Sequence, residues 1–223
     1  SLFGQTVKPT PEMLEGVDVI LCDLPDVGVR FYTYAWSVYH MLEAAGEYGK
    51  PVVVLDRPNP LGGLRVEGPV LDMRCASFLG RAAIPVRHGL TLGELARLCN
   101  AEHLAKPAEL TVIPCEGWRR EMTHPATNMP WTPPSPAMRR YETARVYPGT
   151  CLLEGTNVSE GRGTDRPFEI CGAPWIDGHA LVRKLNDLSL AGLTFREAWF
   201  TPTFSKFQGM LCGGAQIHVT DRN

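Results

Sequence analysis

The chain has 223 residues, of which 44% are hydrophobic, and it carries a formal net charge of −2. A chain of this length and composition can bury a sizeable core in one large or two modest domains. The charge is nearly balanced and well mixed along the chain, so it offers no electrostatic footprint for nucleic acid or for an anionic membrane surface. A small, mostly neutral partner fits better.

Seven cysteines are present, and no two of them are spaced Cys-x-x-Cys. Their odd number and scattered positions argue against a zinc ribbon, a redox motif or a full disulfide framework. No stretch approaches the roughly 20 apolar residues of a membrane span. The chain starts without Met and stops shortly after the strand-like residues 217–219. We therefore expect a fragment truncated at both ends, in which the lack of a signal peptide carries no meaning.

Strands and helices alternate in the expected secondary structure of the first two thirds of the chain. Apolar runs of strand length, glycine and proline boundaries and a Thr-x-x-Glu capping box define these elements. In chain order they are a short helix from Thr10, a strand over 17–22, a helix over 31–48 ending at Gly49, a strand over 51–55, a helix over 91–103, and strands over 110–114 and 150–153. The alternation predicts an α/β fold with a parallel sheet and helices on both of its faces.

The composition changes after Asp165. A helix is expected to open at Asp177 and to end near residue 185, and strands follow over 200–204 and 216–219 with no helix between them. We therefore expect one domain over 1–165 and the start of a smaller α+β domain over 166–223, with the boundary near residues 164–168. The proline-rich residues 128–136 are too rigid for a helix or a central strand, so they are expected to form a long loop.

Acidic residues follow three of the expected parallel strands. Asp23 comes after the first strand, Asp56 with Arg57 after the second, and Glu154 after the fourth. Open parallel sheets bind ligands beyond the carboxyl ends of their strands, so neighbouring strands would bring these carboxylates into one crevice. Capping a following segment or pairing with an arginine is an equally common use of such aspartates. The convergence of several carboxylates on one edge is what favours a functional site.

Residues 147–169 pass from a short apolar run into a loop rich in charge and glycine. The loop holds the carboxylates of Glu154, Glu160 and Asp165, and Gly161 and Gly163 flank Arg162. Glycine lets backbone approach a ligand closely, and loops held by a rigid scaffold often carry function. The pattern therefore favours a functional loop over its alternative, a solvated turn with internal ion pairs.

Paired carboxylates beside aromatic residues indicate glycoside hydrolysis, in which one carboxyl protonates the leaving oxygen and the other acts as nucleophile or activates water. Arg30, Tyr32, Tyr34 and Trp131 are candidate sugar-binding residues. Tyr32 falls on the expected core face of its helix, so Trp131 in the proline-rich loop is the better stacking candidate. His88 is a candidate acid or base, although a lone histidine is more often a structural hydrogen-bonding group.

Other catalytic signatures are absent from the sequence. It contains no Gly-x-x-x-x-Gly-Lys phosphate loop, no Gly-x-Ser-x-Gly elbow around Ser159 and no His-Glu-x-x-His zinc motif. The six histidines are scattered, so no metal site is expected. Glu94 is explained by its capping box.

The sequence as a whole resembles the exo-β-N-acetylmuramidases, a bacterial glycoside hydrolase family of peptidoglycan recycling. The matching segments are residues 26–34, 55–60, 67–69, 85–89 with Glu94 following, 134–136 and 147–169. The resemblance implies a Rossmann-like N-terminal domain, a smaller C-terminal domain and a cleft between them. It also implies release of N-acetylmuramic acid from the non-reducing end of glycan fragments without metal or cofactor, at an extracytoplasmic or periplasmic location.

Two loop residues depart from the family pattern, because Pro25 stands where Gln is usual and Ala137 where Asn is usual. Members of the family also carry an upstream Glu-His-Gly segment that is a candidate for the catalytic acid. This chain starts after that position, so we expect it to hold only part of the site.

The leading hypothesis is a fragment of an exo-acting muramidase. Its expected catalytic carboxyls are Glu160, Glu154 and Asp23, with Glu160 ranked first because Ser159 and Gly161 place it in the flexible part of the loop. The expected substrate-binding residues are Asp26, Arg30, Tyr32, Tyr34, Asp56, Arg57, Asn59, His88, Trp131, Asn157, Ser159 and Arg162. Arg162 or Arg30 offers a guanidinium for the lactyl carboxylate of muramic acid.

Two other functions remain open from the sequence. One is a glycan- or nucleotide-binding module that lacks the chemistry. The other is a phosphate-handling enzyme built on the turn at residues 161–164.

Overall fold

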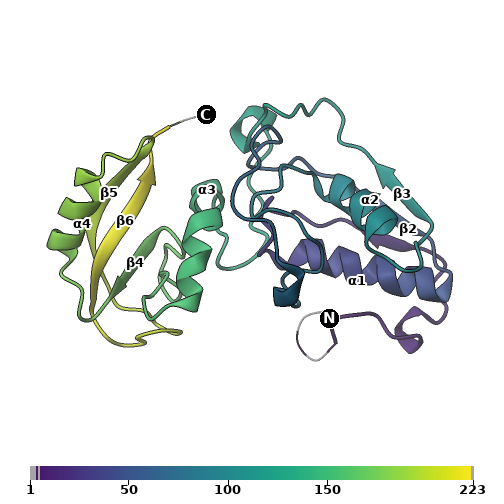
Figure 1. Cartoon of the computed structure of the whole chain (residues 1–223), viewed down its shortest axis with the longest axis horizontal. Helices are drawn as coiled ribbons and strands as arrows, with labels where there is room; N and C mark the ends of the chain where they lie inside the picture. The colour runs from purple at the N-terminus through teal and green to yellow at the C-terminus, as the bar shows by residue number, and fades with distance from the viewer. Residues whose placement is uncertain (1–3, 5, 222–223) are drawn as a thin grey trace. The chain divides into compact units, whose positions relative to one another are not determined.

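The computed structural model describes residue 4 and residues 6–221 of the chain. It divides into two compact units, Ser1–Pro130 and Trp131–Asn223 (Figure 1). The first unit contains a parallel sheet and the second a small antiparallel sheet. The chain is therefore α/β with a C-terminal α+β part, as its sequence predicts.

Three parallel strands form the sheet of the first unit. They are β1 (Ile20–Cys22), β2 (Val52–Leu55) and β3 (Leu110–Ile113), in the order β1-β2-β3. Leu21, Val53 and Thr111 stand in register across the sheet. All three strands were expected from apolar runs in the sequence, which confirms that part of the prediction.

Two helices connect these strands, and their ends follow the signals in the sequence. Helix α1 (Thr33–Tyr48) ends at Gly49, whose left-handed backbone lets its N–H donate to the carbonyl of Ala45. Helix α2 (Leu92–Glu102) begins with the predicted capping box between Thr91 and Glu94. The helix expected from Thr10 is reduced to the 3₁₀ turn Glu12–Leu14.

Both helices pack on the same face of the sheet. Trp36 and Leu42 of α1 and Leu95 of α2 join Cys22 and Val54 in one buried core. On the opposite face, Leu21 is 60% exposed and Ile113 is 49% exposed. Right-handed crossovers place successive helices on one side of a sheet unless the strand order reverses, and the order β1-β2-β3 contains no reversal. Within the described residues, helices therefore cover one face of the sheet rather than the two that were expected.

The strand expected over residues 150–153 does not form, and these residues are helical instead. Helix α3 (Tyr141–Thr150) runs directly into the 3₁₀ helix Cys151–Gly155, and both lie in the second unit. The buried side chains of Ala144, Tyr147 and Cys151 recur at helical spacing. The short apolar run Cys-Leu-Leu has the length of a strand, but it continues the helical period of the residues before it.

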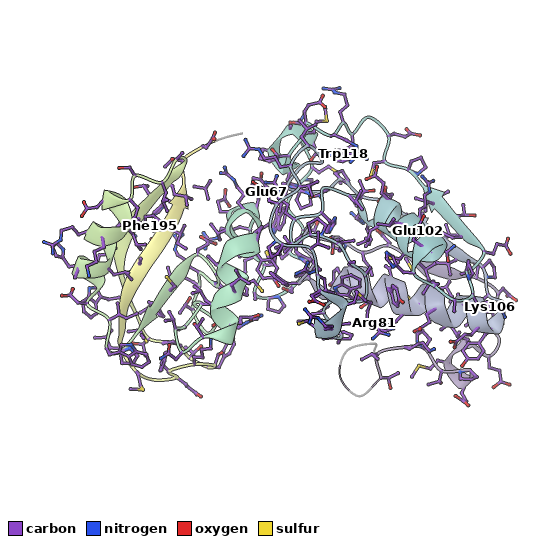
Figure 2. All side chains as sticks on the ribbon, in the orientation of Figure 1. Glu67, Arg81, Glu102, Lys106, Trp118 and Phe195 are labelled. Carbon is purple, nitrogen blue, oxygen red and sulfur yellow. The ribbon has the colours of Figure 1, made fainter. Side chains whose placement is uncertain are left out.

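The second unit is built on strands β4 (Ile170–Ala173), β5 (Leu193–Phe200) and β6 (Cys212–Val219), in the order β4-β6-β5. Both pairings are antiparallel. Helix α4 (Gly178–Asp187) begins at Asp177, whose carboxylate accepts from the N–H of Ala180 at 3.0 Å, as the sequence predicts. The end of α4 is tied to Phe195 of β5, labelled in Figure 2, through the side chain of Asn186. Of the strand expected over 200–204, only Phe200 lies in a strand, as the last residue of β5, so the expectation was wrong for residues 201–204.

The boundary expected near residues 164–168 falls inside the second unit. Ser159 forms a β-bridge with Gly172, and the N–H of Phe168 donates to the carbonyl of Glu160 at 2.6 Å. Thr143 of α3 donates to Glu169 at 2.6 Å. These contacts join α3 and the loop that follows it to the antiparallel sheet. Among the residues that the structure describes, no helix has both the length and the apolar character needed to cross a membrane.

Candidate functional site

Asp23 and Asp56 lie at the same edge of the parallel sheet. They follow β1 and β2, which are parallel neighbours. Arg57 connects the two strand ends, because its Nε donates to Asp23 Oδ1 at 2.6 Å. This hydrogen bond holds the pKa of Asp23 below its usual range. Asp23 is therefore an ionised carboxylate. Its position with Asp56 at one edge of the sheet is the position that the sequence predicts for this pair of strands.

Asp56 anchors helix α2. Its Oδ2 accepts from the hydroxyl of Thr91 at 2.6 Å, and its Oδ1 accepts from the N–H of Gly93 at 2.8 Å. A Cβ on Gly93 would lie 2.7 Å from the carboxyl carbon of Asp56, so the fit requires glycine. The capping role that the sequence left open for Asp56 is the one that the structure shows.

Glu154 follows no strand of this sheet, which removes the reason for expecting three carboxylates to converge at one edge. It lies in the 3₁₀ helix Cys151–Gly155 of the second unit and follows no parallel strand. The expectation failed together with the fourth strand, because the position of Glu154 was inferred from that strand.

The loop after β1 meets two segments that are distant in sequence. Val29 forms a β-bridge with Arg87, and the N–H of Arg30 donates to the carbonyl of Val86 at 2.8 Å. A Cβ on Gly28 would lie 2.3 Å from Asn59 Oδ1, so only glycine lets the two loops approach this closely. Residues 26–30, 59–61 and 85–91 thus assemble into one cluster, which we call the first-unit loop cluster.

Several of the expected binding residues hold this cluster together. Arg30 is buried, and its Nη1 donates to the carbonyls of Pro69, at 2.9 Å, and of Ile84. Asn59 donates to the carbonyl of Leu90 at 2.9 Å. Figure 2 labels Glu67, which accepts from Arg87 Nη1 at 2.7 Å.

Tyr32 is buried, as its place on the core face predicts, and its ring meets the ring of Tyr34 edge-on at 5.1 Å. Pro25, just before the cluster, is half-buried.

The same cluster holds buried polar atoms without a hydrogen-bond partner. Four such side-chain atoms occur among the described residues; three belong to Asp26, Arg87 and His88, and the fourth is Oε2 of Glu160 in the second unit. Such atoms are rare in folded proteins, and each calls for an explanation such as a bound water, an ion or a catalytic role. Asp26 and His88 therefore stand out within the cluster.

Burial shifts the pKa values of Asp26 and His88 in opposite directions. Asp26 Oδ2 accepts from the N–H of Gly28 at 2.8 Å, while Oδ1 is buried without a partner, and burial raises the pKa of Asp26 to about 6. His88 Nδ1 accepts from the N–H of Leu90 at 3.2 Å, and burial lowers the pKa of His88 to about 4. His88 is thus neutral at pH 7. The sequence analysis places Asp26 among the binding residues. The signal in the sequence for its burial is the apolar Val27 and Val29 that follow it.

The second unit contains the charged loop that the sequence singled out. Glu160 is 1% exposed, and its Oε2 lies 3.1 Å from Lys206 Nζ. Lys206 also donates to the carbonyls of Leu153 at 2.8 Å and Val158 at 3.0 Å. Glu160 is therefore a buried partner of an ammonium that ties the loop together, which contradicts the expectation that it lies in a flexible part of the loop. Lys206 was missed because nothing near it in sequence marks it as a partner.

Arg162 is also engaged within this loop. Its Nε donates to Glu154 Oε1 at 2.7 Å and lies 3.7 Å from Glu160 Oε1. Its guanidinium sits 4.9 Å from the centre of the Phe168 ring. The charges of the loop therefore pair with one another, which is the alternative that the sequence left open.

Gly161 and Gly163 serve the packing of the protein's own backbone. Each has a φ of 82°, a value that side chains rarely adopt. A Cβ would lie 2.8 Å from the carbonyl oxygen of Ile170 at Gly161 and 2.4 Å from that of Phe204 at Gly163. The N–H groups of Gly161 and Thr164 donate to Ser159 Oγ and to the carbonyl of Gly161, so these amides are not free to cradle a phosphate.

The remaining expected residues of the second unit differ in burial and in their contacts. Asn157 is exposed, whereas Ser159 is buried and pairs through its backbone with Gly172. Trp131 is half-buried, and its indole N–H donates to the carbonyl of Met138 at 3.2 Å. Ala137 is half-buried. In the part of the chain that the structure describes, no group of His, Cys, Asp and Glu side chains could hold a metal ion.

Known proteins match the chain along its whole length. The family model described as "Exo-beta-N-acetylmuramidase NamZ, N-terminal" matches residues 1–142, and "Exo-beta-N-acetylmuramidase NamZ, C-terminal" matches residues 145–223. The peptidoglycan beta-N-acetylmuramidase NamZ of Bacillus subtilis (strain 168) is 54% identical over 223 residues, which are all of this chain and 54% of that protein.

Two crystal structures of DUF1343 family proteins from Bacteroides fragilis NCTC 9343 are also similar. One superposes with a TM-score of 0.93 at 40% identity, over 99% of this chain and 58% of the other. The second has a TM-score of 0.79 at 34% identity, over 98% of this chain and 57% of the other. The chain spans about half the length of the curated relative that it matches.

Proposed function

The chain belongs to the exo-beta-N-acetylmuramidase NamZ family, and we propose that its parent protein releases N-acetylmuramic acid from the non-reducing ends of peptidoglycan fragments. One observation carries the proposal: the chain is 54% identical, over all 223 residues, to a relative named as a peptidoglycan beta-N-acetylmuramidase. We also propose an extracytoplasmic or periplasmic location, on the basis of the family resemblance.

Glycoside hydrolysis needs one carboxyl that is protonated and one that is ionised. Two carboxyls after β1 have environments that push their pKa values in the opposite directions that such a pair needs. Burial raises the pKa of Asp26 to about 6, whereas the hydrogen bond from Arg57 holds the pKa of Asp23 below its usual range. Environments that push two such pKa values apart are typical of acid and base assignments in active sites. We therefore propose Asp26 as the proton-donating carboxyl and Asp23 as the ionised one.

Glu154 and Glu160 are weaker candidates for the proton donor, because each faces a positive charge that favours an ionised carboxylate. Glu160 is almost fully buried against Lys206, and Glu154 is engaged by Arg162. These ion pairs support a structural role for the loop. They also keep the rival function open, a glycan-binding module without turnover, because such a module needs a shaped surface but no free acid.

Turnover of a chromogenic N-acetylmuramide by the full-length parent protein tests the proposal. We expect Asp26→Asn to lower kcat by about 10² or more, as the loss of general acid catalysis does. Asp18→Asn is the matched control, because Asp18 is exposed just before β1, and it should leave kcat unchanged. An unmutated parent that binds the glycan without cleaving it would establish the binding module instead.

A further inference from the structure

Strand β5 lies at an edge of the antiparallel sheet of the second unit. The strand order is β4-β6-β5, so β5 pairs with β6 alone. Successive residues of an antiparallel strand direct their backbone N–H and C=O groups alternately toward and away from the partner strand. The open side of an edge strand therefore presents unpaired groups to which another extended chain can add. We call the open side of residues 193–200 the β5 edge.

The register shows which residues face the β5 edge. The N–H of Thr220 donates to the carbonyl of Gly192 at 2.8 Å, directly beyond the last paired residues of the two strands. Gly192 therefore faces β6, and so does every second residue after it, starting with Thr194. The residues between them turn their N–H and C=O groups to the open side; they are Leu193, Phe195, Glu197 and Trp199.

Asn186 closes the β5 edge at Phe195, which is labelled in Figure 2. Its Nδ2 donates to the carbonyl of Phe195, and the N–H of Phe195 donates to its Oδ1, both at 3.0 Å. The side-chain amide thus makes the two hydrogen bonds that a residue of an added strand would make. Asn186 belongs to the last turn of α4, which runs beside β5 in Figure 1. A helix side chain therefore stands in for a neighbouring strand.

The β5 edge is open beyond Phe195. Among the described residues, none forms a hydrogen bond with the outward backbone groups of Glu197 and Trp199. Trp199 is also 59% exposed. A pairing that used these two residues alone would gain few hydrogen bonds. Access to Phe195 therefore decides whether another strand can use the edge.

We propose that the β5 edge pairs with the β5 edge of a second copy of this chain, and that Asn186 keeps it closed. β5 is complementary to itself because its charges are balanced. It holds one cation, Arg196, and one anion, Glu197, and its other residues are Thr194 and apolar side chains. Two identical antiparallel strands pair about a two-fold axis, so the assembly closes at a dimer. This pairing is independent of the proposed function.

One register of the pairing is favourable along the whole strand. With the two-fold axis at Phe195, the two Phe195 residues lie opposite each other and form an aromatic pair across the strands. Arg196 then faces Thr194 of the other copy. Glu197 faces Leu193, so like charges do not meet. The central hydrogen bonds come from the outward N–H and C=O of Phe195, which the side-chain amide from α4 blocks.

Sedimentation equilibrium of the 223-residue chain tests the proposal with Asn186→Ala. The unmutated chain must break two hydrogen bonds in each copy before it can pair, whereas the variant breaks none. Each such bond changes an equilibrium constant several-fold, so we expect the Kd of the dimer to be about tenfold lower, or less still, in the variant. Asp187→Ala, at the next exposed position of α4, is the control and should leave the Kd unchanged.

A second substitution shows whether the dimer forms through β5. The N–H of Glu197 faces the open side, so Glu197→Pro removes a donor needed for the pairing but no hydrogen bond to β6. Asn186→Ala combined with Glu197→Pro should therefore return to the Kd of the unmutated chain. If circular dichroism shows that the proline variant does not fold, amide hydrogen exchange of Phe195 in Asn186→Ala replaces it. That amide should exchange about tenfold more slowly in the dimer than in the monomer.

Three results would overturn the proposal. If Asn186→Ala does not dimerise more tightly than the unmutated chain, Asn186 blocks no pairing. If a dimer forms but resists Glu197→Pro, or leaves the amide of Phe195 exchanging as in the monomer, it forms through another surface. If Asn186→Ala dimerises in the 223-residue chain but not in the full-length parent, another segment of the parent covers the β5 edge and a second copy is not its partner.

Discussion

The first-unit loop cluster and the charged loop at residues 154–166 differ in how their polar groups are used. The charged loop carries more ionisable residues, but Glu154, Glu160 and Arg162 pair with one another or with Lys206. The loop cluster carries fewer charges, yet it holds Asp26 and His88 with buried atoms that have no partner. Glu160 Oε2 also lacks a hydrogen bond but faces the ammonium of Lys206 at 3.1 Å, so burial without an opposite charge, rather than charge density, marks the stronger candidate for chemistry.

Lys206→Ala breaks the charged loop most severely. It leaves the carboxylate of Glu160 buried without its ammonium and frees the carbonyls of Leu153 and Val158. Removal of one partner of a buried pair costs about 3 kcal/mol of unfolding free energy. Urea denaturation of the chain measures this loss, and Lys184→Ala on exposed α4 is the control. A loss as small as that of the control would show that the loop is not held by its internal pairs.

Gly161→Ala tests whether the glycines serve packing. The substitution strains a backbone with a φ of 82° and places a methyl group 2.8 Å from the carbonyl oxygen of Ile170. We expect a destabilisation of about 2 kcal/mol. Gly155→Ala is the matched control, because its added Cβ meets nothing within 4 Å. Thermal unfolding should separate the two variants, and equal melting temperatures would return the glycines to a ligand-binding role.

Arg57→Ala should have the smallest effect on stability. The pair with Asp23 is partly exposed, with side-chain exposures of 37% and 45%, and such pairs contribute about 1 kcal/mol or less. The pKa of Asp23 is lower in the folded chain than in the unfolded chain. The contribution of the Arg57–Asp23 pair to stability is therefore present above the pKa of Asp23 in the unfolded chain, and it is lost as the pH falls through the pKa of Asp23 in the folded chain. The free energies of unfolding of the unmutated chain and of Arg57→Ala, measured at pH 7 and at pH 2, should differ at pH 7 only. A difference that persists at pH 2 would mean that Arg57 stabilises the chain by packing.

Local signals in the sequence predicted the helix ends well, because caps act between residues a few positions apart. The capping box of Thr91 and Glu94 and the N-cap of Asp177 are found where they were expected. The strand at residues 150–153 was wrong, because a short apolar run does not distinguish a strand from a buried turn of helix.

Contacts between distant residues could not be predicted in the same way. The pairing of Glu160 with Lys206 depends on how β5, β6 and the loop before β4 meet in space. The unpartnered oxygen of Asp26 likewise depends on the packing of residues 85–91 against the loop after β1. Such features arise from tertiary structure, and a single sequence carries only the weak signal of apolar neighbours.

The carbon-13 chemical shift of the Asp26 carboxyl, followed through a pH titration of the 223-residue chain, tests most directly whether this group is set apart from the other carboxyls. Asp26→Asn assigns the resonance, and Asp23 is the internal comparison. We expect Asp26 to titrate with a pKa of about 6 and Asp23 to titrate below its usual range. If Asp26 instead titrates near 3.8, as an ordinary solvated aspartate does, then its carboxyl is neither buried nor unpartnered, and the contrast between the two loops fails.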